Sequence, residues 1–265
     1  MGFNHKMTSN NDSNDITVGI IGCGFVGGAL KVWLEEHNPN VKIVVSDPPK
    51  GMNDDISAAD VYFLQIHVPT EDDGSQDLTL MKQLISNLPD KPVFVRTTIL
   101  PGTSKKLSDE TKHNVYFMPE FLTERTFIED FKNQPMIFTG EVELLKKIFI
   151  GKKFIIATPL EAEIIKYCHN VFGAYKVTYF NAVYDYCKRV GVDWDTVHSG
   201  MLLSKYINDT HTMVPGPDGK FGYGGKCFPK DVNAFSKLTK DLPIGKLIAP
   251  LHELNIMFRG YEEKI

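Results

Sequence analysis

Short apolar runs alternate with helical patterns from residue 16 to residue 158 of the chain. The runs are rich in Val, Ile and Phe, which is typical of strands, and several of the segments between them carry apolar residues at helical spacing. Strands are predicted at residues 16–21, 41–45, 61–66, 93–97, 115–118, 136–139 and 154–158. Helices are predicted from Ala29 to Leu34, at 78–88 and at 141–149. This alternation predicts an α/β fold with a largely parallel sheet and helices on both of its faces.

One long helix is predicted from Leu160 to Val190, where the pattern changes. Its apolar residues recur at helical spacing and form a broad stripe. They are Ile164, Ile165, Cys168, Val171, Phe172, Tyr175, Tyr179, Val183, Tyr186 and Val190. Lys166 and Asn170 stand four positions apart on the other side, with Asn181 near the same line. This polar line is interpreted either as a solvated face or as a face turned toward a substrate, and its place in the chain favours the substrate.

Three further helical patterns follow, at 194–203, after Cys227 and at 246–258. The chain is therefore predicted to contain a sheet domain, residues 16–159, and a smaller helical domain built on the long helix, residues 160–265. Residues 1–15 are rich in Asn, Ser and Asp and lack an apolar core. Such a segment predicts a disordered tail and not a signal peptide.

The turn after the first strand has the sequence G-C-G-F-V-G, residues 22–27, and leads into a helical pattern. The second strand ends in Ser46 and Asp47. Strand, glycine turn, helix, strand and acid in this order are the dinucleotide-binding fingerprint of a Rossmann fold. Its glycines permit the tight turn, the approach of the pyrophosphate and the close packing of helix on strand. The predicted cofactor contacts here are Gly22, Gly24, Phe25, Val26, Gly27 and Asp47.

Asp47 also predicts which dinucleotide binds. A carboxylate at the end of the second strand can accept hydrogen bonds from the adenosine ribose, and it repels a 2′-phosphate. We therefore expect NAD as the cofactor, in preference to NADP.

Composition excludes several classes of function without choosing among the rest. The 265 residues are 42% hydrophobic and 23% charged, with a formal net charge of −4, so neither nucleic-acid binding nor a membrane span is expected. The four cysteines have neither zinc-site spacing nor the density of a secreted scaffold, which favours a reducing cytoplasm. No metal site is predicted.

Cys227 is the predicted nucleophile. Gly222, Gly224 and Gly225 leave the backbone bare just before it, so that another molecule can approach. Pro229 follows it at the start of a helical pattern, which places the thiol near a helix N-terminus, where the thiolate is favoured. The alternative is a small buried thiol on a turn.

Polar residues follow the predicted strands at the edge of the sheet where ligands bind. Thr70 and Thr98 come after two of them and are interpreted either as polar turns or as ligand contacts. Glu120 and Glu124 follow the next strand and bring carboxylates toward the cofactor crevice.

Six separated motifs together resemble the UDP-glucose/GDP-mannose dehydrogenase family from residue 16 to about residue 240. They are Gly22-x-Gly24-x-x-Gly27, Val68-Pro69-Thr70, Thr97-Thr98-x-x-Pro101-Gly102-Thr103, Pro119-Glu120-Phe121-Leu122-x-Glu124, Glu163-x-x-Lys166-x-x-x-Asn170 and Gly224-Gly225-x-Cys227-x-Pro229-Lys230-Asp231. The first occurs in many dehydrogenases, whereas the last is highly specific.

The resemblance implies the oxidation of a nucleotide sugar, UDP-glucose first, at its C6 hydroxyl to the uronic acid with two NAD reduced. It implies that Lys166, Asn170 and Asp231 serve the alcohol step and that Cys227 captures the aldehyde. Glu120 would activate the water that hydrolyses the thioester, with Glu124 as a second acid. Thr98 would lie beside cofactor and substrate, and Thr70 and Lys230 beside the cofactor. The family also suggests a homodimer formed through the long helix.

The chain departs from the family after Cys227, where 38 residues remain. Members of the family continue into a second nucleotide-binding domain that grips the substrate. We therefore expect a shortened enzyme, a chain cut before that domain, or a protein that works with a partner subunit. Two other hypotheses are a dehydrogenase of a smaller hydroxy-acid or sugar acid, and a non-catalytic NAD-binding partner of a complete homologue.

Overall fold

The computed structural model describes residues 16–260, which form two compact units. The first unit contains residues up to Ile66 together with 84–97 and 107–158, and the second contains 67–83, 98–106 and the residues from 159 onward. Two segments that follow strands are thus grouped with the helical unit, although they precede it in the chain. The tail predicted at residues 1–15 lies outside the described residues.

The first unit is built on a six-stranded sheet of order β3-β2-β1-β4-β5-β6. Its strands are β1 (Ile16–Ile21), β2 (Val41–Asp47), β3 (Met52–Asn53), β4 (Val61–Leu64), β5 (Val93–Val95) and β6 (Val115–Phe117). All neighbouring strands run parallel except β3, which pairs antiparallel with the end of β2. Because the parallel strands alternate with helices, the predicted α/β fold with an N-terminal Rossmann sheet is confirmed.

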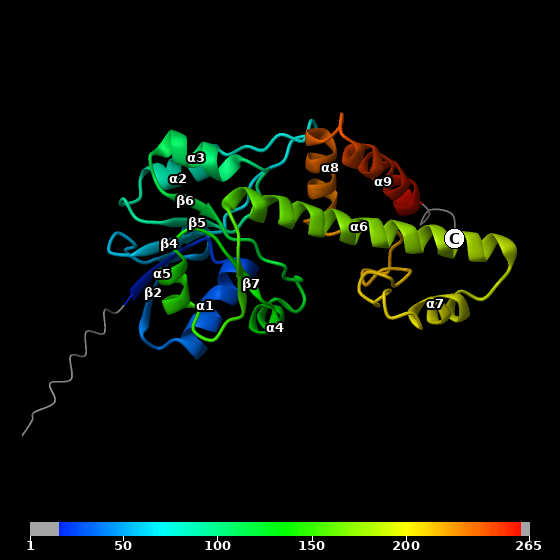
Figure 1. Ribbon diagram of the computed structural model, residues 1–265, viewed down its shortest axis with the longest axis horizontal. Coiled ribbons are helices and arrows are strands. Elements are labelled where there is room, and N and C mark those ends of the chain that lie inside the picture. The colour runs from blue at the N-terminus through cyan, green and yellow to red at the C-terminus, as the bar shows by residue number, and fades with distance from the viewer. Residues whose placement is uncertain (1–15, 261–265) are drawn as a thin grey trace, which may run out of the picture. The chain divides into compact units, whose positions relative to one another are not determined.

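A large apolar core lies between this sheet and the helices on one of its faces (Figure 1). The helices there are α1 (Phe25–His37), α4 (Phe127–Asn133) and α5 (Val142–Ile148). Trp33 of α1 contacts Phe131 of α4 and Phe149, with ring centroids 6.1 and 5.6 Å apart. This packing fixes the helix whose first turn forms the predicted cofactor site.

Two predicted strands do not join the main sheet. β7 (Met136–Phe138) and β8 (Phe154–Ile156) pair in parallel with each other in a separate two-stranded sheet. The sequence pattern predicted their existence, but it did not contain the information on which strands pair. The first unit also contains a short 3₁₀ helix, η1 (Pro48–Lys50), directly after β2.

Two helices, α2 (Thr79–Ser86) and α3 (Thr103–Thr111), each belong in part to the first unit and in part to the second. The sequence pattern predicted α2, whereas it gave no signal for α3. The reason is the polar composition of α3, whose nine residues include one leucine as their only large apolar side chain.

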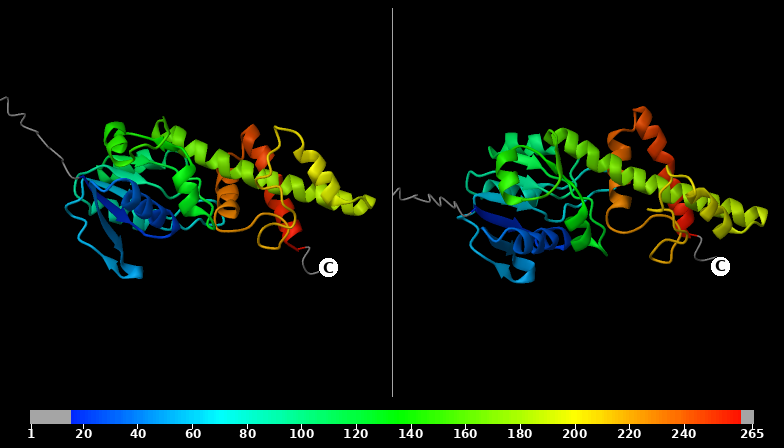
Figure 2. Two further views of the ribbon diagram at one scale, coloured as in Figure 1. Left: turned by 90° about the horizontal axis from the view of Figure 1, so that it is seen from below. Right: turned by 60° about the horizontal axis from the view of Figure 1, so that its bottom comes forward.

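The second unit is organised around α6 (Pro159–Val190), which runs without interruption for 32 residues (Figure 2). The other helices of this unit are α7 (Trp194–Leu202), α8 (Phe228–Leu238) and α9 (Pro243–Arg259). Tyr167 of α6 stacks on Phe235 of α8 with ring centroids 5.2 Å apart. Gly173 has a steric role in a second contact between the same two helices, because a Cβ there would lie 2.7 Å from the ring of Phe228.

The burial of the two sides of α6 is the opposite of what the interpretation of the polar line as a solvated face predicts. Lys166, Asn170 and Asn181 are buried, so the polar line is not a solvated face. In contrast, Phe172 and Tyr186 of the apolar stripe are 65% and 64% exposed. The reason is that the polar side chains find hydrogen-bond partners within the unit, which periodicity along one helix does not reveal.

Candidate functional site

The glycine turn between β1 and α1 has a steric reason for two of its three glycines. Gly22 has a φ of 85°, which an L side chain rarely adopts. A Cβ on Gly27 would lie 2.2 Å from the carbonyl oxygen of Gly22, so the first turn of α1 packs directly on the turn. No atom lies within 4 Å of a Cβ placed on Gly24. The open space at Gly24, next to the start of α1 at Phe25 and Val26, suits a phosphate group.

The end of β2 holds this turn from the other side. The backbone N–H of Cys23 donates to Oδ2 of Asp47 at 2.7 Å, and Nζ of Lys50 donates to the carbonyl oxygen of Cys23 at 2.6 Å. The Asp47 carboxylate therefore lies against the glycine turn, where the fingerprint requires an acid. The contact of Lys50 with the glycine turn was not predicted. Its position three residues after Asp47 could have indicated it. These residues fit a bound NAD.

The two predicted glutamates after β6 lie in different environments. Glu120 is buried, and its Oε2 accepts a hydrogen bond of 2.7 Å from the backbone N–H of Leu122. Glu124, in contrast, is exposed. Glu120 is thus the carboxylate with a fixed orientation.

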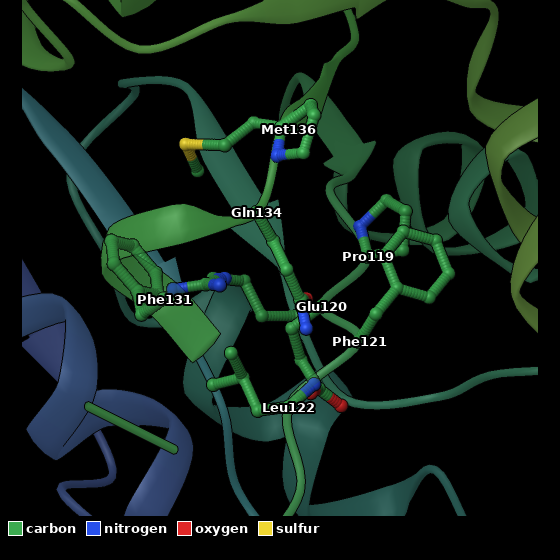
Figure 3. A pocket seen from close by; sticks show the side chains of 9 residues that line it. Pro119, Glu120, Phe121, Leu122, Phe131, Gln134 and Met136 are labelled. Carbon is green, nitrogen blue, oxygen red and sulfur yellow. The ribbon is translucent and has the colours of Figure 1, made fainter. Parts of the chain in front are cut away.

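Glu120 lines a small pocket in the first unit (Figure 3). The other lining residues are Arg96, Pro119, Phe121, Leu122, Phe131, Gln134, Pro135 and Met136. Burial lowers the pKa of the Arg96 guanidinium to about 10, and the charge of Glu120 opposes that shift. Arg96 also lies 5.1 Å from the centre of the Phe131 ring. Arg96 was missed by the sequence analysis, because an arginine at the end of a strand is usually exposed.

In the second unit, Gln76 fixes the backbone around Thr98. Its Oε1 accepts from the N–H of Leu100 at 2.8 Å, and its Nε2 donates to the carbonyl oxygen of Thr98 at 3.2 Å. The same Nε2 lies 3.4 Å from the Tyr167 hydroxyl on α6. Thr98 is buried at this point, and the buried hydroxyl of Thr70 has no hydrogen-bond partner within residues 16–260.

Glu163 joins the next part of this segment to α6. Its carboxylate accepts hydrogen bonds from the backbone N–H groups of Gly102, at 2.6 Å, and Ser104, at 2.8 Å. Both groups lie at the start of α3, where backbone N–H groups lack partners in the helix. Glu163 is completely buried. Its burial raises the pKa of the carboxyl above the usual value, while the two hydrogen bonds oppose that shift.

A raised pKa at Glu163 predicts that the contribution of this carboxyl to stability falls as pH rises. The folded protein holds the proton of this carboxyl to higher pH than the unfolded chain, so the contribution is complete below the unfolded pKa and is lost as pH rises through the folded pKa. Glu163→Gln should remove this part of the slope, at most about 1.4 kcal/mol per pH unit. Urea unfolding between pH 4 and pH 7 measures both slopes, and identical slopes would contradict the prediction.

Asn170 and Asp231 form a buried pair that joins α6 to α8. Nδ2 of Asn170 donates to Oδ2 of Asp231 at 2.7 Å, across 61 positions of sequence. Lys230 pairs with Oδ1 of the same carboxylate. Asp231 is completely buried, and Lys166 and Asn170 are 3% and 4% exposed. Asn170, Lys230 and Asp231 therefore share one polar centre within the second unit, and Lys166 is buried one helical turn before Asn170 on α6.

Cys227 is the residue immediately before α8 and is partly exposed. Its carbonyl oxygen accepts from the N–H of Asp231 at 2.9 Å, which is the first hydrogen bond of that helix. Pro229 stands in the first turn, as the sequence predicted. The thiol is thus placed at the start of a helix whose first turn carries the buried acid.

The loop before Cys227 is held by two asparagines and an arginine. Oδ1 of Asn181 accepts from the N–H of Gly222 at 2.9 Å. Asn255 of α9 bonds both backbone groups of Tyr223, at 2.7 and 3.0 Å, and Nε of Arg259 donates to the Tyr223 carbonyl oxygen. The α9 residues were not predicted, because nothing near them in sequence marks their partner. Asn181, predicted to face a substrate, instead supports the cysteine loop.

Among residues 16–260, no helix is long and apolar enough to span a membrane. Two family models match the chain. Residues 49–151 match the NAD binding domain of the UDP-glucose/GDP-mannose dehydrogenase family, and residues 160–255 match the central domain of the same family.

Individual proteins show the same relationship. The chain is 31% identical over 237 residues to a GDP-mannose 6-dehydrogenase of Pseudomonas putida, which covers 79% of this chain and 52% of the relative. A UDP-glucose dehydrogenase from Pyrobaculum islandicum superposes with a TM-score of 0.72 at 23% identity, over 92% of this chain and 69% of that one. A 3-hydroxyisobutyrate dehydrogenase of Mycobacterium tuberculosis shares the fold at a TM-score of 0.66 and 14% identity, over 92% of this chain and 95% of that one.

The chain spans about half the length of the curated relatives it matches. The family models cover most of it, from the NAD-binding domain to the central domain, and NAD is the cofactor that these domains indicate. The chain belongs to the UDP-glucose/GDP-mannose dehydrogenase family.

Proposed function

We propose that the protein oxidises a nucleotide sugar, with UDP-glucose as the first candidate, at its C6 hydroxyl to the uronic acid. The observation that carries this proposal is the position of Cys227, partly exposed at the start of α8, with the Asn170–Asp231 pair in the first turn of the same helix. A hydroxy-acid dehydrogenase that forms no covalent intermediate has no need of a cysteine there.

In the first half of the reaction the substrate hydroxyl loses its proton and C6 loses a hydride, which NAD accepts when bound. Lys166 and Asp231 take up the hydroxyl proton. Asn170 and Lys166 stabilise the negative charge that develops on the substrate oxygen. Thr98 orients the reacting end of the substrate, and Thr70 and Lys230 contact the cofactor.

In the second half the Cys227 thiolate forms a C–S bond with the aldehyde carbon and gives a thiohemiacetal. Loss of a second hydride from that carbon, for which a second NAD would be the acceptor, together with loss of the hydroxyl proton gives a thioester. Glu120, with Glu124 as a second acid, activates a water whose oxygen adds to the thioester carbon. The C–S bond then breaks, which releases the acid and regenerates the thiolate.

The stoichiometry of the reaction tests this proposal. The protein is mixed with excess NAD and, in turn, UDP-glucose, UDP-N-acetyl sugars and GDP-mannose. We expect two NADH for each acid formed with one of these substrates, measured by absorbance and mass spectrometry in the same sample. One NADH for each product, or a free aldehyde as the product, would contradict a covalent four-electron reaction.

We also propose that two copies associate through α6. Three aromatic residues on this helix, Phe172, Tyr179 and Tyr186, are at least half exposed, and large aromatic side chains are typical of interface centres. Exposed apolar surface of this kind in a long helix favours a protein partner.

Charges on this face should separate the two copies. The variant Phe172→Glu/Tyr179→Glu is expected to sediment as a monomer at concentrations at which the unmodified protein is a dimer, because two buried carboxylates have no counter-charge. Tyr206→Glu is the matched control, since Tyr206 is highly exposed outside α6. A monomeric unmodified protein, or a dimeric double variant, would rule out this interface.

A further inference from the structure

Gln65 carries a buried amide with no hydrogen-bond partner within residues 16–260. Both its Oε1 and its Nε2 are inaccessible to solvent, and neither atom makes a hydrogen bond within these residues. Buried side-chain amides are nearly always paired, because an unpaired one loses its hydrogen bonds to water without replacement. An exception of this kind calls for a partner that arrives from outside the chain.

The unpaired amide lies beneath the glycine turn. Gln65 follows β4, and its backbone N–H donates to the carbonyl oxygen of Ile21, the last residue of β1, at 2.9 Å. A Cβ on Gly22 would lie 2.7 Å from the Gln65 carbonyl oxygen, and a Cβ on Gly27 would lie 2.9 Å from Gln65 Nε2. The side chain therefore lies against both the turn and the first turn of α1.

This location suits a particular chemical group. The N-terminus of α1 and the open space at Gly24 favour an anion, and in parallel sheets ligands bind beyond the carboxyl ends of strands such as β1 and β4. The amide of Gln65 offers two N–H donors, which anionic oxygens accept, and one acceptor, which a water molecule can satisfy.

We propose that on NAD binding the Gln65 side chain turns from beneath the turn toward the open space at Gly24, and that its Nε2 then donates a hydrogen bond to the pyrophosphate, directly or through one water molecule. The proposal depends on NAD binding, which the family indicates, and is independent of the sugar oxidation proposed above. It also implies a trade-off, because an unpaired amide weakens the free protein and strengthens the complex.

The trade-off predicts that one variant weakens NAD binding without lowering the stability of the free protein. In Gln65→Leu the free protein is expected to melt at the same or a higher temperature, because a buried unpaired amide is removed. Its dissociation constants for NAD and ADP-ribose should rise roughly tenfold or more, since a hydrogen bond to a charged group is lost. Adenosine, which lacks the pyrophosphate, should bind within about twofold of its affinity for the unmodified protein.

Calorimetric titration with NAD, ADP-ribose and adenosine measures all three constants, and Gln83→Leu, at an exposed glutamine on α2, is the control. Gln65→Glu has nearly the same shape and opposes the phosphate charge, so it should weaken NAD binding even more than the leucine variant and serves if that variant does not fold. Unchanged affinity for NAD in both variants would overturn the proposal. An equal loss for adenosine would also overturn it, because Gln65 would then act only through the shape of the turn. If the unmodified protein bound no NAD, the cofactor assignment itself would be at fault.

Discussion

Replacing Cys227 with alanine is expected to abolish formation of the acid and to leave NAD binding unchanged. In the proposed reaction the Cys227 thiolate forms and later releases the bond to the substrate carbon, and no other cysteine lies in the loop between α7 and α8. Removing a covalent nucleophile typically costs a factor on the order of 10⁴ or more in turnover. The measurement is the rate of acid formation, with the dissociation constant for NAD determined separately.

Two further variants test whether the loss of activity is due to the missing nucleophile. Cys227→Ser keeps the size of the side chain but offers a hydroxyl, which is a far weaker nucleophile than a thiolate, so acid should form at a small fraction of the normal rate. Cys168→Ala removes an exposed cysteine from α6 and should leave the rate unchanged. A fully active Cys227→Ser enzyme would favour the dehydrogenase of a smaller hydroxy-acid.

The sequence was most informative where a local pattern and its chemistry coincide. The order of β1, glycine turn, α1 and β2 could be predicted because each feature is encoded by consecutive residues. The start of α8 was predictable for the same reason, since Pro229 favours the first turn of a helix. Cys227 could therefore be placed before the structure was known.

Partners distant in the sequence were the part that could not be predicted. α3 lacks an apolar rhythm, and its first N–H groups are satisfied by Glu163, which lies about 60 positions away. Gln76 holds the backbone of Thr98 and Leu100 in the same way. Such contacts explain why the strand-end segments are grouped with the helical unit. The periodicity of apolar residues along the sequence does not predict contacts of this kind.

The polar line on α6 shows where pattern reasoning reaches its limit. Lys166 and Asn170 would suit a solvated face on periodicity alone, and Asp231 lies on another helix more than 60 positions later. The family motif placed these residues in one site, whereas the spacing along α6 allowed both interpretations. Burial decides against solvent, because polar side chains enter a core only with partners.

Asp231→Ala is expected to lower the free energy of unfolding by about 2–4 kcal/mol. Asp231 is completely buried and accepts the hydrogen bond of the Asn170 amide at 2.7 Å. Without the carboxylate this amide stays buried with a donor unpaired. Lys230, in contrast, is partly exposed and can turn to water, so it contributes less to the loss. Urea unfolding measures the change, and Asp241→Ala, at an exposed position, should alter it by less than about 0.5 kcal/mol.

The variant Asp231→Asn separates the structural role of this residue from its proposed chemical role. The asparagine oxygen can still accept from Asn170, so most of the stability is retained, with an expected loss of about 1 kcal/mol. A neutral amide, however, cannot take up the proton of the substrate hydroxyl, and turnover should fall by roughly 10²–10⁴-fold. Stable and inactive Asp231→Asn protein would assign the carboxylate to proton transfer. Stable and active protein would restrict Asp231 to holding Asn170 in place, and the proton would then pass to Lys166 alone.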